Sequence, residues 1–268
     1  MVTDTKSIVR SLAKGFRILE AFDPEEAEMT LSQIAERARL DVGTTFRLVN
    51  TLVMLGYLQQ VKGKRYRLGF KVLDLGFTSI ARMDLPKSAR PLLRSLLEDN
   101  VCDSANIDVV DGSDLVRIER IQRGLQKPGL DQRLGSRVPV IGTPVGQVIL
   151  AHLPKAHWLR LNIENGMNGR TAVSEAGQNL ESVKKRGYAY TEPSSNAGEG
   201  LVVVPVLDVE GFPNAALSVT SSEREFSKEA FLDRIARRVV QTARDLERIW
   251  RISGSTYPSR SGSVQQER

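Results

Sequence analysis

The residues best suited to binding a polyanion lie between residues 42 and 67. Arg47 and Asn50 fall three residues apart in a segment with helical spacing, so their side chains project from one face. Guanidinium, ammonium and amide groups can contact phosphates and the edges of bases. Four cations follow this segment, at Lys62, Lys64, Arg65 and Arg67.

The side chains that most often carry catalysis or bind metals are few and scattered. His152 and His157 lie five residues apart across a Leu-Pro break, so they share no helical face. Cys102 follows an apolar segment without a neighbouring cation or histidine in the sequence, which favours an inert thiol over a nucleophile. We therefore expect no catalytic residue, no metal site and no cofactor, and we do not expect an enzyme.

Four aspartates lie close together between residues 103 and 114, but their spacing does not match a calcium-binding loop. Turn and surface positions account for them better, and Asp108 alternatively faces a ligand cavity. The sequence also lacks a phosphate-binding glycine motif and a nucleophile elbow. The aspartates are Asp103, Asp108, Asp111 and Asp114.

The positive charge of the chain is concentrated near its start. Of the net charge of +6, residues 1–82 carry +4, from 13 Lys and Arg against 9 Asp and Glu. An enzyme with an anionic substrate would more naturally concentrate cations around a later pocket. Cys102 is the single cysteine, so no intramolecular disulfide can form, which excludes a disulfide-stapled secreted scaffold.

Membrane and export signals are missing from the sequence. No apolar run approaches the roughly 18 residues that a membrane-spanning helix needs. The segment MVTDTKSIVRSLAKG has neither the apolar core nor the cleavage site of a signal peptide. We expect a cytoplasmic protein without a membrane partner, built from one large or two ordinary domains.

Three amphipathic segments precede the cations and predict three helices. The first covers residues 7–22 and ends at Asp23-Pro24, because the residue before a proline avoids the helical region. Its apolar side chains recur at helical spacing and predict one buried face. They are Ile8, Leu12, Phe16, Leu19 and Phe22.

The second and third helices precede a short hairpin. Thr30 is predicted to cap a helix over residues 31–40, and Asp41 to cap a helix that Gly56 terminates. Strands Tyr57–Val61 and Arg65–Leu68 then flank a Lys62-Gly63 turn. Three helices followed by a basic hairpin form the layout of a winged helix-turn-helix. The inward positions are Leu31, Ile34, Ala35 and Ala38 in the second helix and Thr45, Leu48, Val49 and Leu52 in the third.

This layout predicts DNA binding by the third helix and the hairpin. A recognition helix fits the major groove, its N-terminus favours a phosphate, and wing cations reach nearby phosphates or the minor groove. Two alternatives stay open. The segment is an ordinary helical hairpin, or Arg47 pairs with Glu36 or Asp41 and Phe46 is half-buried packing. The candidate DNA-binding residues are Val42, Gly43, Thr44, Thr45, Phe46, Arg47, Asn50, Lys62, Lys64 and Arg65.

The rest of the sequence mixes helices and strands. Pro86 is predicted to interrupt the helical pattern, and Asp111-Gly112 and Glu210-Gly211 mark two hairpin turns. The predicted helices cover residues 69–82, Ser88–Asn100, Thr143–His152, Ser174–Arg186 and Ser227–Ile252. The predicted strands are Ala105–Val110, Leu115–Ile121, Leu201–Leu207 and Ala215–Thr220.

The order of these segments resembles the IclR (isocitrate lyase regulator) family of transcription regulators. In the first part the resemblance rests on SLAKGFRILEAF, LSQIAERARL, TTFRLVNTLVMLGYL and YRLGFKVLDLG. In the second part it rests on VVDGSDLVRIERI, LGSRVPVIGTPVGQVILAHLP and KKRGYAYTEPSSNAGEGLVVVPVLDVEGFPNAALSVT. It covers residues 7–250, and its specificity lies in the order and spacing of the segments together.

The resemblance implies an α+β fold, with a winged helix-turn-helix, a linker helix and an effector domain whose curved antiparallel sheet is flanked by helices. The implied bounds are 1–68 for the DNA-binding domain, 69–84 for the linker, 85–252 for effector binding and oligomerisation, and 253–268 for a disordered tail. The implied partners are a double-stranded DNA operator, a small organic acid and further copies of the chain, as a homodimer or a dimer of dimers.

In the family the organic acid sits where a glycine-rich loop meets the later strands. This sequence departs there: Pro144 removes an N–H donor, aliphatic residues in GLVVVPV replace a cysteine, and Thr191 replaces an acidic residue. A more apolar pocket favours an aromatic or otherwise bulky acid over a small ketoacid, and ordinary packing is the alternative for each position. The candidate effector-binding residues are Ile141, Gly142, Thr143, Val145, Thr191, Leu201, Ser218 and Thr220.

Two functional hypotheses follow from the sequence. The first is a ligand-responsive DNA-binding regulator of a catabolic operon, with an aromatic or other organic carboxylic acid as effector. The second is a small-molecule enzyme or ligand sensor whose basic N-terminal domain serves protein contacts. DNA affinity that falls steeply with salt separates the two.

Overall fold

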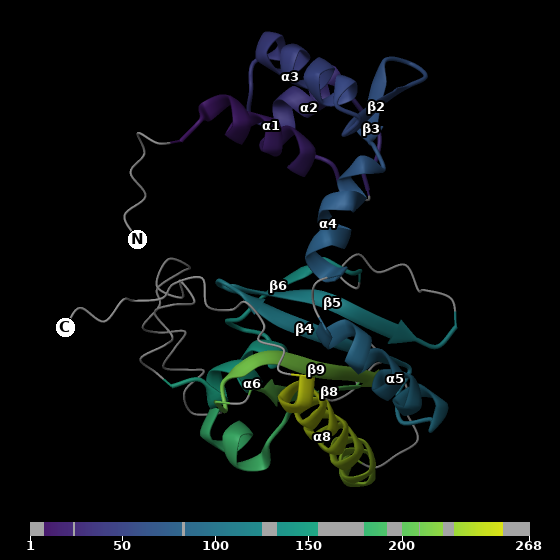
Figure 1. Ribbon diagram of the computed structural model, residues 1–268, viewed down its shortest axis with the longest axis vertical. Helices are drawn as coiled ribbons and strands as arrows, with labels where there is room; N and C mark the ends of the chain where they lie inside the picture. Colours follow the sequence, from purple (N-terminus) through teal and green to yellow (C-terminus); the bar gives the residue numbers. More distant parts are fainter. Residues whose placement is uncertain are drawn as a thin grey trace, which may run out of the picture. The chain divides into compact units, whose positions relative to one another are not determined.

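The computed structural model describes residues 8–23, 25–81, 84–124, 133–154, 180–191, 200–208, 210–221 and 228–253. The chain divides into two compact units, residues 1–82 and residues 83–268. Figure 1 follows the chain through its labelled helices and strands. Among the described residues, no helix is long and apolar enough to cross a membrane.

The first unit combines helices with a small antiparallel sheet. The sheet has the order β1-β3-β2, so the two-residue strand β1 lies beside the second strand of the hairpin. α2 follows β1 directly, and α3 leads into the hairpin (Figure 1). The elements are α1 (Arg10–Glu20), β1 (Met29–Thr30), α2 (Leu31–Arg37), α3 (Val42–Met54), β2 (Leu58–Val61), β3 (Arg65–Leu68) and α4 (Lys71–Ala81).

The core of the first unit is built from one side of each of the first three helices and from the hairpin. Ile18 of α1, Ile34 of α2 and Val49 of α3 are fully buried in one apolar cluster. Leu58 of β2 closes the cluster. The inward positions predicted for α2 and α3 are confirmed: Ile34, Ala35, Ala38, Thr45, Val49 and Leu52 are buried, and Leu31 and Leu48 are half-buried.

The buried face predicted for α1 is partly wrong. Ile8, Leu12 and Phe16 are 50%, 61% and 50% exposed, whereas Ile18, outside the predicted set, is fully buried. Phe22 is buried as predicted. Helical spacing identifies an apolar side of a helix but not the surface that covers it. In the first unit α2 and α3 cover only the side that contains Ile18.

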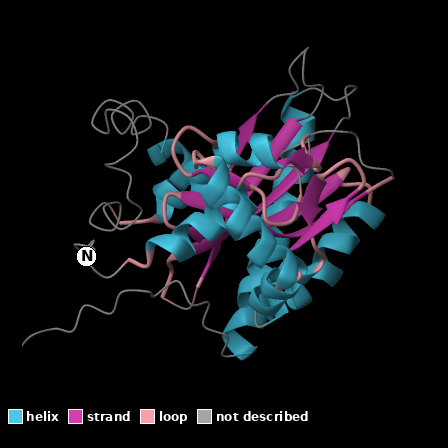
Figure 2. Ribbon diagram, turned by 90° about the horizontal axis from the view of Figure 1, so that it is seen from above, coloured by secondary structure: helices cyan, strands magenta, loops and turns pink. Residues whose placement is uncertain are grey.

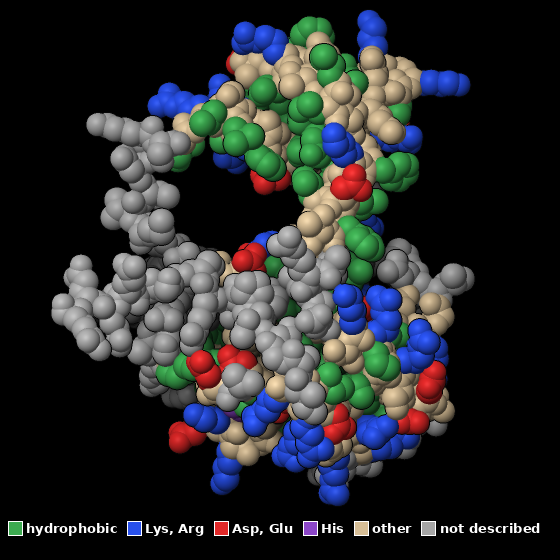
Figure 3. All heavy atoms as spheres, viewed as in Figure 1, with side chains coloured by type: hydrophobic (Ala, Val, Ile, Leu, Met, Phe, Trp, Pro, Cys, Tyr) green, Lys and Arg blue, Asp and Glu red, His purple; other side chains and the backbone are tan. Residues whose placement is uncertain are grey.

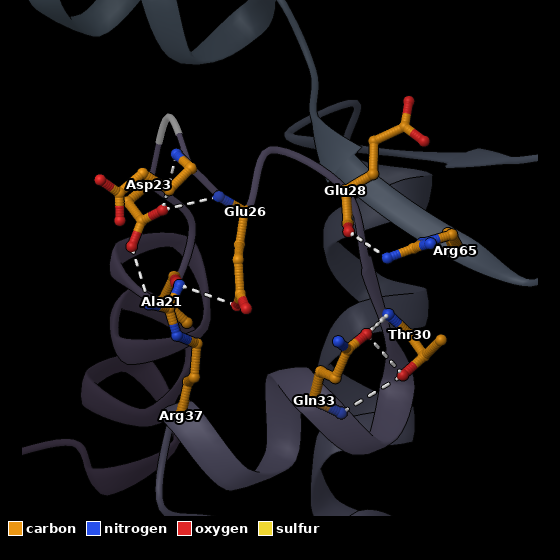
Figure 4. Close-up of polar contacts among 9 residues, drawn as sticks. Ala21, Asp23, Glu26, Glu28, Thr30, Gln33, Arg37 and Arg65 are labelled. Atoms are coloured by element: carbon orange, nitrogen blue, oxygen red, sulfur yellow. Dashed lines mark hydrogen bonds and ion pairs between the residues drawn. The ribbon is translucent and has the colours of Figure 1, made fainter. Parts of the chain in front are cut away.

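Local sequence signals fix the helix ends that were predicted. At α2 the Gln33 N–H donates to the Thr30 hydroxyl over 3.4 Å, and the Thr30 N–H donates to the Gln33 side chain over 2.9 Å (Figure 4). At α3 the Asp41 carboxylate accepts from the Thr44 N–H over 2.8 Å. Gly56 follows α3 with a φ of 81°, a left-handed conformation that favours glycine. The caps and the terminating glycine are confirmed.

The second unit is built on a six-stranded antiparallel sheet with the order β6-β5-β4-β9-β8-β7. Its two central hairpins, β4–β5 and β8–β9, are joined by pairing between β4 and β9. This arrangement confirms the predicted α+β class. The elements are α5 (Asp84–Glu98), β4 (Ser104–Asp111), β5 (Asp114–Gln122), β6 (Arg137–Pro139), α6 (Pro144–His152), β7 (Ala189–Thr191), β8 (Gly200–Leu207), β9 (Pro213–Ser221) and α8 (Lys228–Ser253).

Helices cover both faces of this sheet, and Figure 2 shows strands lying among them. On one face, α5 and α8 pack against alternate strand residues such as Ile107, Val204 and Leu217. On the other face, α6 and the helical residues 180–186 pack against Val203 and Ala216. The period of two along each strand therefore separates two apolar cores.

Several local features differ from the prediction. α5 begins at Asp84, so Pro86 lies inside its first turn, where the backbone N–H groups have no helical acceptor and proline is compatible. The strands β1, β6 and β7 were not predicted, because two or three residues carry too little periodicity. The β4–β5 loop is Gly112-Ser113, one residue later than predicted.

Some predicted segments fall only partly within the described residues. The linker segment 69–84 contains α4. Of the predicted helix Ser174–Arg186, residues 180–186 are helical. The beginning of that helix, the Ser227 cap and residues 254–268 lie outside the described residues.

Gly146 in α6 packs directly against backbone of the residues before the helix. A Cβ atom built there would lie 1.6 Å from the Val140 carbonyl oxygen. We expect Gly146→Ala to lower the free energy of unfolding by about 3 kcal/mol, because backbone must move to relieve the overlap. Urea unfolding followed by fluorescence of the buried Trp250 measures the change.

Gln147→Ala is the matched control on the same helix, where the side chain is half-buried. It should change the free energy of unfolding by less than about 0.5 kcal/mol. Equal midpoints for the two variants would contradict the close approach of α6 to Val140.

Candidate functional site

The N-terminal half of α3 presents the side chains that were predicted to face DNA. Val42 and Phe46 are 53% and 49% exposed, and Gly43, Arg47 and Asn50 are also exposed. None of the ion pairs found among the described residues involves Arg47, so the proposed pairing with Glu36 or Asp41 is not formed. Phe46 packs only partly against the unit.

Thr45 is a correction to the predicted DNA-binding set. Its side chain is fully buried, and its hydroxyl donates to the Asp41 carbonyl over 2.9 Å. Thr45 is one of the inward positions predicted from helical spacing, so its side chain does not reach the exposed surface of α3. Thr44, one residue earlier, is half-buried.

The N-terminus of α3 already holds an anion. The Asp41 carboxylate accepts the Thr44 N–H, and this hydrogen bond lowers the pKa of Asp41. The Asp41 carboxylate therefore uses one of the N–H donors at the helix N-terminus, where the sequence predicted a DNA phosphate.

The wing is a tight β2–β3 hairpin with Lys62 and Lys64 exposed at its tip. Gly63 and Lys64 have φ angles of 77° and 57°, both left-handed. Arg65 is exposed, but its guanidinium donates to the Glu28 carbonyl over 2.9 Å, which ties β3 to the segment before β1 (Figure 4). Of the three predicted wing contacts, the two lysines are exposed at the tip, and Arg65, in the strand pair next to the turn, is engaged with Glu28.

Arg37 braces α2 against the loop that follows α1, a contact that the sequence analysis missed. Its guanidinium donates to the Asp23 carboxylate over 2.7 Å and to the Ala21 carbonyl over 2.9 Å, and lies 3.3 Å from Glu26 (Figure 4). The hydrogen bond from Arg37 lowers the pKa of Asp23. The acidic loop thus positions the first helix of the helix-turn-helix pair.

A buried polar row crosses the central strands of the second unit. Asn106 of β4 and Ser218 of β9 are cross-strand neighbours, and the Asn106 amide donates to the Ser218 hydroxyl over 3.3 Å. The Ser218 hydroxyl donates to Asp108 over 3.4 Å, and Arg117 donates to Asp108 over 3.0 Å. Buried polar groups persist where hydrogen bonds satisfy them.

Ser218 and Asp108 were singled out from the sequence, whereas Asn106 and Arg117 were not. Every second residue of β4 from Ser104 to Asp108 is polar, and this alternation is the signal that could have identified Asn106. Arg117 could not be identified from the sequence in this way. Its position beside Asp108 depends on the register of β4 with β5, which shifts at Asp108.

The structure brings three of the predicted effector-binding residues into one row. Thr191 is the partner of Leu201 across β7–β8, and Leu201 is the partner of Thr220 across β8–β9. The Thr220 and Ser104 hydroxyls lie 2.7 Å apart. Thr191 is exposed, while Leu201 and Thr220 are half-buried. Ser218 lies two residues before Thr220, on the same face of β9.

The loop before α6 and the first turn of that helix contain the other predicted effector-binding residues. Ile141 and Val145 pack in the same apolar cluster as Leu201, and Gly142 has a φ of 80°. The Thr143 hydroxyl donates to the Pro139 carbonyl over 2.8 Å and accepts from the Gly146 N–H over 3.1 Å. Thr143 therefore caps α6, and its hydroxyl, which was predicted to contact the effector, is used within the protein.

The cysteine, histidine and aspartate side chains that were considered for catalysis or metal binding are buried or contact other groups of the protein where the structure describes them. Burial raises the pKa of the Cys102 thiol to about 12, which keeps it protonated. His152 lies 2.9 Å from the Val148 carbonyl, and His157 lies outside the described residues. Asp111 and Asp114 both pair with Arg137. Within the described part of the chain, no cluster of three or more His, Cys, Asp or Glu could hold a metal ion.

Two family models match the chain in the order of its two units. Residues 11–62 match the IclR helix-turn-helix domain. Residues 77–248 match the C-terminal domain of the bacterial transcriptional regulator IclR. The second match alone covers more than half of the chain.

Curated relatives match along most of their length. The Pca regulon regulatory protein of Pseudomonas putida is 25% identical, over 91% of this chain and 85% of the relative. The p-hydroxybenzoate hydroxylase transcriptional activator of Acinetobacter baylyi is 26% identical, over 91% of this chain and 93% of the relative.

A solved structure shares the fold. The crystal structure of a transcriptional regulator from Rhodococcus sp. RHA1 superposes with a TM-score of 0.74 and 25% identity, covering 92% of this chain and all of that chain. The helix-turn-helix unit, the antiparallel sheet with its helices and the matches to both models agree. The chain belongs to the IclR family of bacterial transcription regulators.

Proposed function

We propose that this regulator controls a catabolic operon and responds to an aromatic or similarly bulky organic carboxylic acid. The observation that carries the proposal is the similarity to two curated relatives, one named for the Pca regulon and one for activating p-hydroxybenzoate hydroxylase. The substrate of that hydroxylase is an aromatic acid. Because the relatives are regulators, we propose no catalytic role, and we place the protein in the cytoplasm with its DNA.

The DNA-binding role is assigned to the exposed side of α3 and to the wing tip. Arg47 and Asn50 are suited to base edges, since guanidinium and amide groups form paired hydrogen bonds with guanine and adenine. Lys62 and Lys64 are suited to backbone phosphates, which fix the register of the protein on the duplex. The exposed Val42 and Phe46 supply apolar contact.

Replacing Arg47 tests this assignment. We expect Arg47→Ala to weaken operator binding by about tenfold, within the range for loss of one base-contacting arginine. Stability should hardly change, because the side chain is exposed and has no ion pair among the described residues. Fluorescence anisotropy with the DNA upstream of the gene measures affinity, and thermal unfolding measures stability.

Arg17→Ala is the matched control, since Arg17 is an exposed arginine on α1 of the same unit. It removes the same charge and should leave affinity within about twofold. A large loss of stability with unchanged DNA affinity in Arg47→Ala would support the packing alternative.

The effector is assigned to the sheet face that carries Ser218 and Thr220, next to the loop before α6. One part of this sheet face is apolar and is formed by Leu201, Val203 and Ala216. The neighbouring part is polar and is formed by Asn106 and Ser218. An aromatic ring with a carboxylate matches such a division, because ligand sites combine apolar walls with a few placed polar groups.

A thermal-shift screen tests the ligand class. At a concentration one hundred times its Kd, an effector stabilises the native state by about 2.7 kcal/mol, which raises Tm by about 5–10 °C. We expect this shift with 4-hydroxybenzoate or a related aromatic acid rather than with glyoxylate or pyruvate. A shift confined to the two- and three-carbon ketoacids would sink the aromatic assignment.

Two isosteric variants locate the site. Thr220→Val should abolish the shift, because it removes a hydroxyl from the proposed site. Thr242→Val is the control: Thr242 is buried in α8, where its hydroxyl donates to the Arg238 carbonyl. It should retain the shift at a lower starting Tm.

The proposed oligomer is a homodimer that associates into a dimer of dimers. Its support is the exposed apolar surface of the first unit. Ile8, Leu12 and Phe16 recur every four residues at the start of the chain, and Leu73 and Phe77 of α4 are 64% and 76% exposed. An apolar surface of this kind is typical of a protein interface. A second copy of the chain is the occupant that the family suggests.

We expect Phe16→Glu to shift the protein toward the monomer, because a charge would be buried in the interface. Light scattering coupled to size-exclusion chromatography measures the mass. Glu20→Gln, at an exposed position on the same helix, is the control and should leave the mass unchanged. A Phe16→Glu protein with the wild-type mass would place the interface elsewhere.

A further inference from the structure

Two large apolar side chains are exposed on the part of α3 that is assigned to DNA. Val42 and Phe46, at 53% and 49% exposure, lie four residues apart and therefore on one side of the helix. We name them the apolar pair. Among the described residues, the core cluster of the first unit and the partly buried side chains packed against it include neither. On the first unit in Figure 3, hydrophobic side chains reach the surface beside basic ones.

The row of α3 that contains the apolar pair continues into the core of the unit. Val49 lies seven residues after Val42, about two helical turns, and is buried. Val53 lies seven residues after Phe46 and is half-buried. The first unit thus covers the C-terminal half of this row and leaves its N-terminal half open. In a recognition helix, the N-terminal residues are those that contact base edges.

The helix turn before Phe46 leaves room for a base. Gly43 lies three residues before Phe46 and four before Arg47, so it is the neighbour of both on the helix surface. A Cβ atom built at Gly43 would meet one atom within 4 Å among the described residues outside its own helix backbone, an Asp41 carboxylate oxygen at 3.4 Å. The first turn of α3 contains no acidic residue that would repel DNA. A base edge can therefore approach the helix closely beside Phe46.

The base edges in the major groove offer one apolar group to such a surface. This group is the C5 methyl of thymine, and the other groups that distinguish the bases there are hydrogen-bond donors and acceptors. Arg47 and Asn50 are suited to the donors and acceptors. An apolar side chain against a polar edge would leave that edge without hydrogen-bond partners, which is unfavourable. The thymine methyl group is therefore the chemical match for the apolar pair.

We propose that Phe46 contacts the methyl group of a thymine in the operator and makes α3 selective for thymine at that position. Val42, one turn earlier on the same side, extends the apolar surface. The inference rests on the proposed DNA-binding function and deepens it, because it names a base that α3 reads in addition to the contacts of Arg47 and Asn50. Burial of one methyl group corresponds to about a fourfold preference for thymine over uracil, which lacks only this group.

DNA that contains uracil tests the proposal with the full-length protein. The probe is the duplex upstream of the gene, prepared once with thymine and once with uracil at every thymine position, and fluorescence anisotropy measures affinity. Wild-type protein should bind the thymine duplex about fourfold more tightly for each contacted methyl group. Phe46→Ala should weaken binding to the thymine duplex by a similar factor and should remove the preference. Single uracil substitutions then locate the thymine.

The controls separate the methyl contact from DNA shape and from packing. Met54→Ala removes an apolar side chain that is 88% exposed at the last residue of α3, and it should keep the wild-type preference. Phe46→Leu retains an apolar side chain and should keep part of the preference, which serves the test if Phe46→Ala does not fold. Any effect of uracil on the shape of the duplex is the same for every variant. Thermal unfolding verifies that each protein folds.

The possible outcomes are distinct. A preference for thymine that Phe46→Ala loses and Met54→Ala keeps supports the proposal. Equal affinity of wild-type protein for the two duplexes overturns the thymine contact and leaves the DNA-binding function standing. A preference that Phe46→Ala retains also overturns it, and a loss of stability in that variant would then assign Phe46 to packing. Wild-type protein that binds the upstream duplex no more tightly than an unrelated duplex would refute sequence-specific DNA binding itself.

Discussion

The antiparallel pairing of β4 with β9 is the contact on which the second unit depends. It joins residues 116 positions apart in the chain, such as Ser104 and Thr220, and makes one sheet from two local hairpins. One face of the pair sends Ile107 and Leu217 into the core under α5 and α8, and the other face carries the polar row. A slip of one residue would exchange these faces. A single register therefore fixes both the apolar core and the candidate effector site.

Elements with local signals could be predicted from the sequence. Thr30, Asp41 and Gly56 fix helix ends through hydrogen bonds and backbone angles within a few residues. Elements defined by a distant partner could not. β1 exists because Met29 and Thr30 pair with β3, and Arg37 finds Asp23 only once α1 and α2 are packed. The spacing of residues along the sequence does not reveal a contact partner that only the tertiary structure brings close.

The candidate sites divide in the same way. The exposed side of α3 follows from helical periodicity, which places Arg47 and Asn50 outward. The same periodicity buries Thr45, and the Asp41 cap uses one N–H donor of the N-terminus where a phosphate was predicted. In the second unit, Ser218 could be singled out, but its partner Asn106 depends on the register of two strands that are distant in the sequence.

The hydrogen bonds of Thr143 have a consequence for how any ligand would be received. This hydroxyl joins the Pro139 carbonyl to the Gly146 N–H, and Gly146 packs directly against Val140, so the loop is tied at both ends to the start of α6. Preorganisation of this kind reduces the entropy lost on binding. If the effector binds beside this loop, as proposed, discrimination between ligands would rest on the shape of the loop rather than on its closure around them.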